Sequence, residues 1–193
     1  MNILAVGAHP DDIEYGCGGY LARLAKEHDV TCLVATNGER GGDPETRLTE
    51  QQIAHALLGL HRRLLAQVPD TRVAAADLRD YLEQAVTGQD IVLVNTPEDS
   101  HQDHRAIALA TLAAARRVPR VLCYHAPSST RVFTRVVCAD ITATLPQKLD
   151  ALRCHASQAR HRLEELAAAE ATFWGGRAGV PHAEAFEPVR WLL

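Results

Sequence analysis

The sequence lacks the basic excess that nucleic-acid binding needs. Its 20 Lys and Arg stand against 24 Asp and Glu, which gives a net charge of −4. Acidic and basic residues are interspersed rather than gathered in blocks, so no basic surface patch is expected. We therefore expect a small-molecule or glycan substrate and no nucleic-acid partner.

Long apolar runs and paired cysteines are missing as well. The first apolar run covers only residues 3–8, with no Lys or Arg before it, and is too short for a secretion signal or a membrane span. The five cysteines form an odd set without a Cys-x-x-Cys pair, and Cys32, Cys123 and Cys138 lie in apolar runs typical of buried thiols. These features predict a reducing, cytoplasmic setting and no membrane insertion.

The order of apolar runs and helical patterns predicts an α/β fold. A strand at 3–8, a helix at 17–27 and a strand at 30–35 would form a βαβ unit with parallel strands. The Gly-x-Gly-x-x-Gly sequence of dinucleotide-binding folds is absent, since the glycines fall as Gly16-x-Gly18-Gly19. A length of 193 residues suits one domain over 1–193, because such a chain buries roughly 70% of its unfolded surface.

The remaining elements follow from the same patterns. Helices are expected at 45–66, 74–86, 101–117, 145–156 and 158–171, and strands at 91–94, 119–124 and 132–137. Residues 67–73 read as a polar connection, and Ser100 as the cap of the helix that begins at His101. The tail, 174–193, is expected to be irregular; it could cover the active-site crevice or form a contact in a homo-oligomer.

Residues that bind metals or move protons follow two of the expected strands. His9, Asp11 and Asp12 come directly after the first strand, and a segment that ends in His104 follows the strand at 91–94. Pro10 fixes its own φ and restricts the residue before it, which tightens the first turn. Because ligands of open α/β sheets bind beyond the carboxyl ends of the strands, His9, Asp12 and His104 form a candidate metal triad.

Two imidazoles and one carboxylate are typical ligands of catalytic zinc, and ferrous iron accepts the same set. Asp11, beside ligand Asp12, would be free to act as a general base. His101 lies one helical turn before His104 and could stabilise an oxyanion as imidazolium, with Asp103 holding its tautomer or raising its pKa. Asp103 also fits a capping box, which is a purely structural explanation for it.

A glycine-rich loop, 36–44, follows the second strand at the same predicted edge of the sheet. Arg40 and Arg47, on and after this loop, could meet a polar substrate. A solvated surface charge is an equally good interpretation of either residue.

The motifs together resemble a known family. Ala8-His9-Pro10-Asp11-Asp12, the glycines that follow and His101-x-Asp103-His104 are similar to the motifs of the PIG-L/LmbE-like zinc de-N-acetylases. The resemblance implies a Rossmann-like three-layer sandwich with a mostly parallel sheet, and removal of an acetyl group from an N-acetylglucosamine-type amino sugar or sugar conjugate. It implies His9, Asp12 and His104 as zinc ligands, Asp11 as the base that later protonates the amine, and His101 as oxyanion stabiliser.

The sequence departs from the family pattern at Gln102, His125 and Asp99, which leaves the substrate more open than the reaction. The segment between Leu60 and Asp90 is short, and we expect it to open the crevice or to remove a strand at the sheet edge. Two other functions remain: metal-dependent hydrolysis of another amide or of a phosphoester, and non-catalytic sugar binding. Phosphoryl transfer often uses two metals about 4 Å apart, and the sequence offers one triad.

Overall fold

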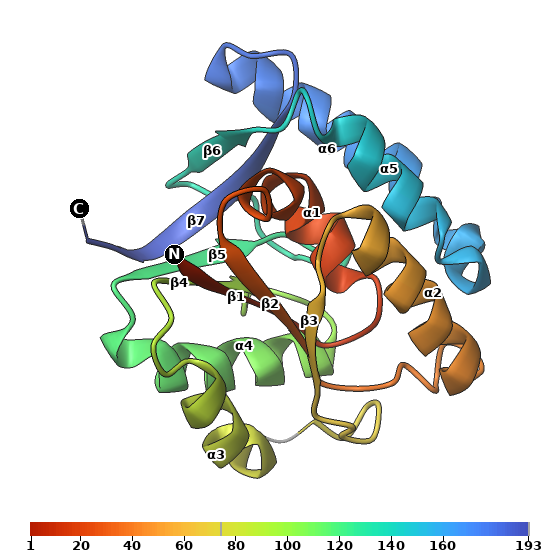
Figure 1. Ribbon diagram of the computed structural model, residues 1–193, viewed down its shortest axis with the longest axis vertical. Helices are drawn as coiled ribbons and strands as arrows, with labels where there is room; N and C mark the ends of the chain where they lie inside the picture. Colours follow the sequence, from red (N-terminus) through yellow and green to blue (C-terminus); the bar gives the residue numbers. More distant parts are fainter. Residues whose placement is uncertain (74, 193) are drawn as a thin grey trace.

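The computed structural model describes residues 1–73 and 75–192 and contains a sheet of seven strands in the order β3-β2-β1-β4-β5-β7-β6 (Figure 1). The first five strands pair in parallel, whereas β7 runs antiparallel to both β5 and β6. The strands are β1 (Asn2–Gly7), β2 (Asp29–Val34), β3 (Arg62–Leu65), β4 (Ile91–Asn95), β5 (Arg120–Tyr124), β6 (Val137–Asp140) and β7 (Ala183–Trp191).

Helices cover both faces of the sheet, which confirms the predicted Rossmann-like three-layer α/β fold (Figure 1). Side chains from α1, α2 and α5 pack on one face, and side chains from α3 and α4 pack on the other. None of the helices in the described part of the chain is both long and apolar enough to cross a membrane. The helices are α1 (Asp12–Leu24), α2 (Pro44–Leu57), α3 (Ala75–Ala85), α4 (Gln102–Ala114), α5 (Leu145–Arg153) and α6 (Leu163–Ala178), with short 3₁₀ turns η1 (Ala115–Arg117) and η2 (Ala156–His161).

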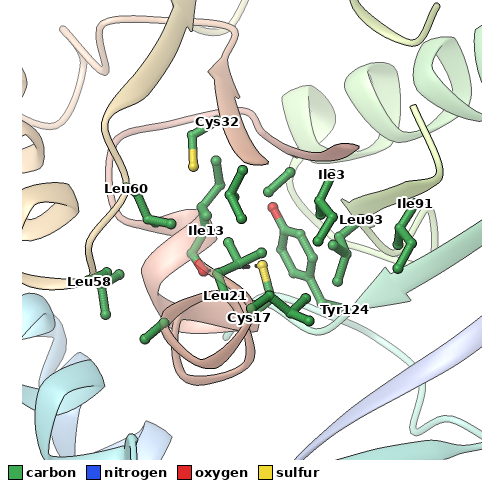
Figure 2. Close-up of a cluster of buried hydrophobic side chains, with 14 of the residues drawn as sticks. Ile3, Ile13, Cys17, Leu21, Cys32, Leu58, Leu60, Ile91, Leu93 and Tyr124 are labelled. Carbon is green, nitrogen blue, oxygen red and sulfur yellow. Dashed lines mark hydrogen bonds between the residues drawn. The ribbon is translucent and has the colours of Figure 1, made fainter. Parts of the chain in front are cut away.

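Strand β1 lies in the middle of the sheet because its residues are apolar on both faces. Ile3 and Ala5 join the core beneath α1, whereas Leu4 and Val6 join the core beneath α4, as expected for a buried parallel strand. Tyr124, at the end of β5, fills the space beneath α1, where Figure 2 shows it among the apolar side chains. Its hydroxyl donates to the Val6 carbonyl at 2.7 Å, so the ends of β1 and β5 are held together.

The expected helix at 45–66 is wrong. Helix α2 ends at Leu57, and Gly59 adopts a φ of 75°, a left-handed conformation that closes helices and suits glycine. The chain then returns to the sheet, where Arg62–Leu65 pairs with β2 as edge strand β3. The expectation that the short segment after Leu60 removes a sheet-edge strand is therefore also wrong.

The prediction of an irregular tail, 174–193, is also wrong. Helix α6 continues to Ala178 and ends at Gly179, which has a φ of 76°, and β7 then enters the sheet between β5 and β6. The first residues of β7 are buried and include apolar Ala183, Ala185 and Phe186 as well as charged Glu184. Pairing on both edges therefore explains this strand better than its weak sequence pattern does.

Smaller differences concern boundaries. Helix α1 begins at Asp12 rather than residue 17, the strand expected at 132–137 lies at Val137–Asp140, and residues 156–161 form η2 before α6 begins. Ala74 and Leu193, at the ends of the predicted helix 74–86 and the predicted tail, lie outside the described residues.

Candidate active site

Neighbouring strands β1 and β4 bring two distant segments together at the carboxyl edge of the sheet. The Nδ1 atom of His9 lies 3.2 Å from Nε2 of His104. Asp12 places its two carboxylate oxygens 3.6 Å from His9 Nδ1 and 3.2 Å from His104 Nε2. The structure therefore brings together the three side chains of the predicted triad, all of them buried.

The turn after β1 fixes the position of Asp12. One of its carboxylate oxygens accepts hydrogen bonds from the backbone amides of Ala8 and His9 at 2.9 and 2.8 Å. Asp12 is the first residue of α1, and the chain turns between the strand and this helix within a few residues. The carboxylate is thus held by backbone groups, which leaves it little rotational freedom.

In His9 and His104, the ring nitrogen that points away from the triad faces an acidic side chain. His104 Nδ1 lies 3.0 Å from Asp99, and His9 Nε2 lies 3.1 Å from Asp70 and 3.4 Å from Asp103. A carboxylate partner keeps the proton on that nitrogen, so the opposite nitrogen can present its lone pair. Two such lone pairs and the Asp12 carboxylate face one another, and this set of donors fits a divalent zinc or iron ion.

The carboxylates in and around the triad favour the binding of positive charge, either as protons on the histidines or as a metal ion. Burial opposes protonation of His104, but Asp12 and Asp99 outweigh it and raise the pKa of His104 to about 10. Burial likewise opposes the charge on Asp12, yet the His104 and His9 imidazoles lower its pKa well below the ordinary value. A metal ion would replace these protons, so we expect its affinity to increase with pH.

Two other groups could also hold an ion: His9 with His101 and His104, and His9 with Asp70 and Asp103. The second group meets His9 at Nε2, on the side of the ring opposite the triad. That contact is better explained as orientation of His9, because metal-bound histidines usually donate their other N–H to an acid.

Asp11 lies beside the triad in a strained backbone conformation, with a φ of 112°. Its carboxylate accepts a hydrogen bond from Arg47 Nη2 at 3.0 Å. Burial, followed by the charge of Asp12, raises the pKa of Asp11 to about 6, and Arg47 partly opposes this rise. A carboxylate with this pKa can accept a proton near neutral pH and return it.

Arg47 is buried and donates hydrogen bonds to three residues on two loops of the site. Besides Asp11, it donates to the Pro10 carbonyl at 2.6 Å and to the Gly38 carbonyl at 2.9 Å. This position differs from that of Arg40, which is exposed at the rim. Of the two predicted substrate residues, Arg47 therefore mainly holds the loops after β1 and β2 together.

His101 lies against the triad, with its ring centre 4.7 Å from that of His9 and 4.9 Å from that of His104. It is the N-cap of α4, because its Nδ1 accepts from the Asp103 amide at 3.2 Å. Ser100, the expected cap, instead donates to the Ser128 carbonyl. Burial, followed by the charges of His9 and His104, lowers the pKa of His101, which is opposite to the expected imidazolium.

Asp103 faces His9 rather than His101. Its carboxylate accepts from the Thr71 amide at 2.6 Å and lies 3.4 Å from His9 Nε2. Among the hydrogen bonds of the described residues, none joins this carboxylate to the His101 ring.

Sequence reasoning missed Asp70, which was assigned to a polar connection. Asp70 follows β3, so it reaches the same edge of the sheet as His9, and it accepts from the Arg40 amide at 3.0 Å. Recognising β3 would have shown it as another acid at a strand end. Arg160 and His161, at the end of η2, were missed for a different reason, since they belong to an exposed turn far along the chain.

These residues line one cleft of about 480 Å³, a size typical of small-molecule sites. The triad and Asp11 lie in the cleft with Asp70 and His101, and the wall carries charged and apolar side chains. The wall residues are Arg40, Arg47, Pro127, Ser128, Gln158, Arg160, His161, Leu163 and Leu166.

The fold and the site define the class of the protein: a Rossmann-like α/β protein with a candidate metal centre at the carboxyl edge of its sheet. The family model of PIG-L, described as GlcNAc-PI de-N-acetylase, matches residues 4–115. The chain belongs to the PIG-L family of deacetylases.

Relatives match over most of the chain. The chain is 37% identical over 167 residues to an uncharacterized deacetylase, YaiS, of Escherichia coli, covering 80% of this chain and 90% of the relative. It is 31% identical over 196 residues to a probable N-acetyl-alpha-D-glucosaminyl L-malate deacetylase 2 of Bacillus subtilis, with 86% of each chain covered. The crystal structure of the conserved protein TT1542 from Thermus thermophilus superposes with a TM-score of 0.88 and 31% identity, covering 99% of this chain and 95% of that one.

Proposed function

We propose that the protein is a metal-dependent hydrolase that removes the N-acetyl group from an N-acetylglucosamine-type amino sugar or sugar conjugate. The observation that carries this proposal is the convergence of His9, Asp12 and His104 beside Asp11 in one cleft. The deacetylase relatives from E. coli and B. subtilis support the reaction, and the name of the second supports an N-acetylglucosaminyl conjugate.

The triad would hold zinc or ferrous iron. A divalent ion bound there would lower the pKa of a water molecule and polarise the amide carbonyl. The protein contributes the orientation of the ligands, since Asp99 holds His104 and the Asp70–Asp103 pair holds His9. In this proposal Asp103 therefore positions His9, instead of holding the tautomer of His101.

Asp11 is the general base. It accepts a proton from the attacking water as the new C–O bond forms at the acetyl carbon. It then returns this proton to the sugar nitrogen as the C–N bond breaks, which releases acetate and the free amine. Arg47 holds one of its carboxylate oxygens, so the side chain keeps its position during both transfers.

His101 stabilises the oxyanion of the tetrahedral intermediate. Because its Nδ1 accepts from the Asp103 amide, a neutral ring carries its proton on Nε2. The lowered pKa of His101 favours this neutral form. His101 would thus act as a neutral hydrogen-bond donor rather than as the imidazolium expected from the sequence.

Replacement of Asp11 with Asn tests the assignment. Acetate release from an N-acetylglucosaminide should fall by about 10²–10⁴-fold, the range for loss of a general base, while the bound metal remains. Asp150→Asn, which changes an exposed carboxylate on α5, is the matched control and should retain activity. Near wild-type turnover in the metal-loaded Asp11→Asn protein would exclude Asp11 as the base.

A further inference from the structure

We propose that Gln102 is a positioning residue of the metal centre and that it acts through the segment between β3 and α3. We call residues 66–73 of this segment the strap. Gln102 Nε2 donates to the Thr71 carbonyl at 2.6 Å, which holds the strap where Asp70 meets His9. The inference rests on the proposed function, because His9 is a ligand of the proposed metal triad.

The first half of the strap continues alongside the end of β2. The amides of Ala66 and Val68 donate to the carbonyls of Val34 and Ala35 at 3.1 and 2.9 Å. From Asp70 onward, the contacts that place the strap come from the loop after β2 and from α4. The second half of the strap therefore depends on side chains of distant segments.

The loop after β2 holds Asp70. The Asp70 amide donates to Glu39 Oε1 at 2.7 Å, and the Asp70 carboxylate accepts from the Arg40 amide at 3.0 Å. The same carboxylate lies 3.1 Å from His9 Nε2, and only 5% of Asp70 is exposed. An acid in this position orients a metal ligand, so the position of the strap decides how firmly His9 is held.

The first turn of α4 holds the next residue, Thr71, through both of its backbone polar groups. Gln102 donates to the Thr71 carbonyl, and the Asp103 carboxylate accepts from the Thr71 amide at 2.6 Å. This turn also carries His104. Gln102 and Asp103 therefore connect the helix that carries one ligand to the strap that supports the other, His9.

Thr71 is held in a strained conformation. Its φ of 64° lies in the left-handed region, which is unusual for a β-branched residue. Such a conformation costs free energy and persists only where the surrounding contacts determine it. Without Gln102, the Thr71 carbonyl would lose the side chain that holds it, and we expect the strap to relax away from His9.

Helix α4 itself does not need the Gln102 side chain. Its N-cap is His101, whose Nδ1 accepts from the Asp103 amide. Gln102 is the first residue of the helix and is exposed. A substitution at Gln102 therefore removes a contact of the strap while leaving the start of α4 intact.

Zinc affinity tests the inference, measured by competition between the metal-free protein and a chromophoric chelator. Gln102→Met keeps the length of the side chain and removes its donor. This variant should bind zinc about three- to tenfold more weakly than the wild type, the range that one neutral hydrogen bond supplies. Gln147→Met is the matched control, because Gln147 Nε2 donates to the Leu57 carbonyl outside the cleft; it should bind zinc as the wild type does.

A double-mutant cycle tests the route through Asp70. Asp70→Ala should weaken zinc binding by about 10–100-fold, as is typical for loss of an acid that orients a histidine ligand. In the Asp70→Ala protein, Gln102→Met should cause no further loss. At saturating Co²⁺, the visible absorption bands, which report the ligand geometry, should change in Gln102→Met and not in Gln147→Met.

The outcomes separate this inference from the proposed function. Wild-type zinc affinity in Gln102→Met, or an equal loss in the presence and absence of Asp70, would overturn the role of Gln102 and leave the deacetylase in place. A wild-type protein that binds zinc but releases no acetate would overturn the proposed reaction and leave the role of Gln102 standing. A wild-type protein that binds no zinc would overturn both.

Discussion

Arg47 is the residue whose replacement tests the structural account of the site most sharply. Arg47→Met keeps most of the side-chain volume but removes the hydrogen bonds to Asp11, Pro10 and Gly38. It also removes the ion-pair partner of Asp11, whose side chain is only 16% exposed. The variant should therefore be much less stable than the wild type.

The size of the effect follows from burial. Removing one partner of a buried ion pair costs about 3–5 kcal/mol of unfolding free energy, because the remaining charge has no partner. The Arg153–Asp150 pair is 57% and 60% exposed, and such exposed pairs contribute about 0–1 kcal/mol. Arg47→Met should thus cost at least about 3 kcal/mol, and the control Arg153→Met at most about 1 kcal/mol.

Urea unfolding of the metal-free protein, at about pH 8 and with chelator present, provides the measurement, since a bound ion would add its own stabilisation. In the wild type Asp11 is ionised there, because burial and Asp12 raise its pKa only to about 6 against the opposing effect of Arg47. Loss of Arg47 would raise this pKa further, so the pH is kept well above 6. In a double-mutant cycle, Arg47→Met/Asp11→Asn should be clearly more stable than the sum of the single effects predicts. Strict additivity, or a loss for Arg47→Met equal to that of the control, would refute the buried ion pair.

Two further predictions concern the support of α1. Burial opposes protonation of His155, but the charge of Glu14 outweighs burial and raises the pKa of His155. The ion pair of protonated His155 with Glu14 therefore stabilises the fold. This contribution is complete below the unfolded-state pKa near 6.5 and is lost as the pH rises through the folded-state pKa. His155→Gln should therefore lose more unfolding free energy at about pH 6 than at about pH 9, and equal losses would contradict the ion pair. A Cβ on Gly16 would lie 2.0 Å from the Tyr124 ring, so Gly16→Ala should cost about 3 kcal/mol or more by overpacking. Gly176→Ala, in open space on α6, should be neutral or stabilising. Thermal unfolding of both variants checks this, and a similar loss in both would contradict the packing argument.

The core of the site could be predicted because its residues follow strong strand signals. His9 comes directly after β1, and His104 lies on the helix that follows β4; both strands are buried on both faces and pair in parallel, so the segments that follow them meet at one edge of the sheet. Asp70 was missed because β3 is a half-exposed edge strand, whose sequence, Arg62–Leu65, continues the helical pattern of α2. Strand β7 was missed because its stability comes from pairing with distant strands on both sides, which no local pattern records.

Side-chain partners were harder to predict than positions. Asp103 is adjacent to His104 in sequence and two residues after His101, so spacing favoured a contact with His101. The structure instead rotates the Asp103 carboxylate toward His9 and the Thr71 amide. The orientation of the Asp103 carboxylate depends on the segment between β3 and α3, which supplies the Thr71 amide. The position of this segment relative to α4 could not be predicted from the sequence.

The most direct test of the account is metal content measured together with acetate release, for the wild type and for His104→Ala. After removal of all metal and addition of zinc, the wild type should bind one ion in the triad and release acetate from an N-acetylglucosaminide. His104→Ala should lose both the ion and the activity while remaining folded. Wild-type acetate release by metal-free protein, or by His104→Ala without a bound ion, would contradict the central claim that the triad holds a catalytic metal.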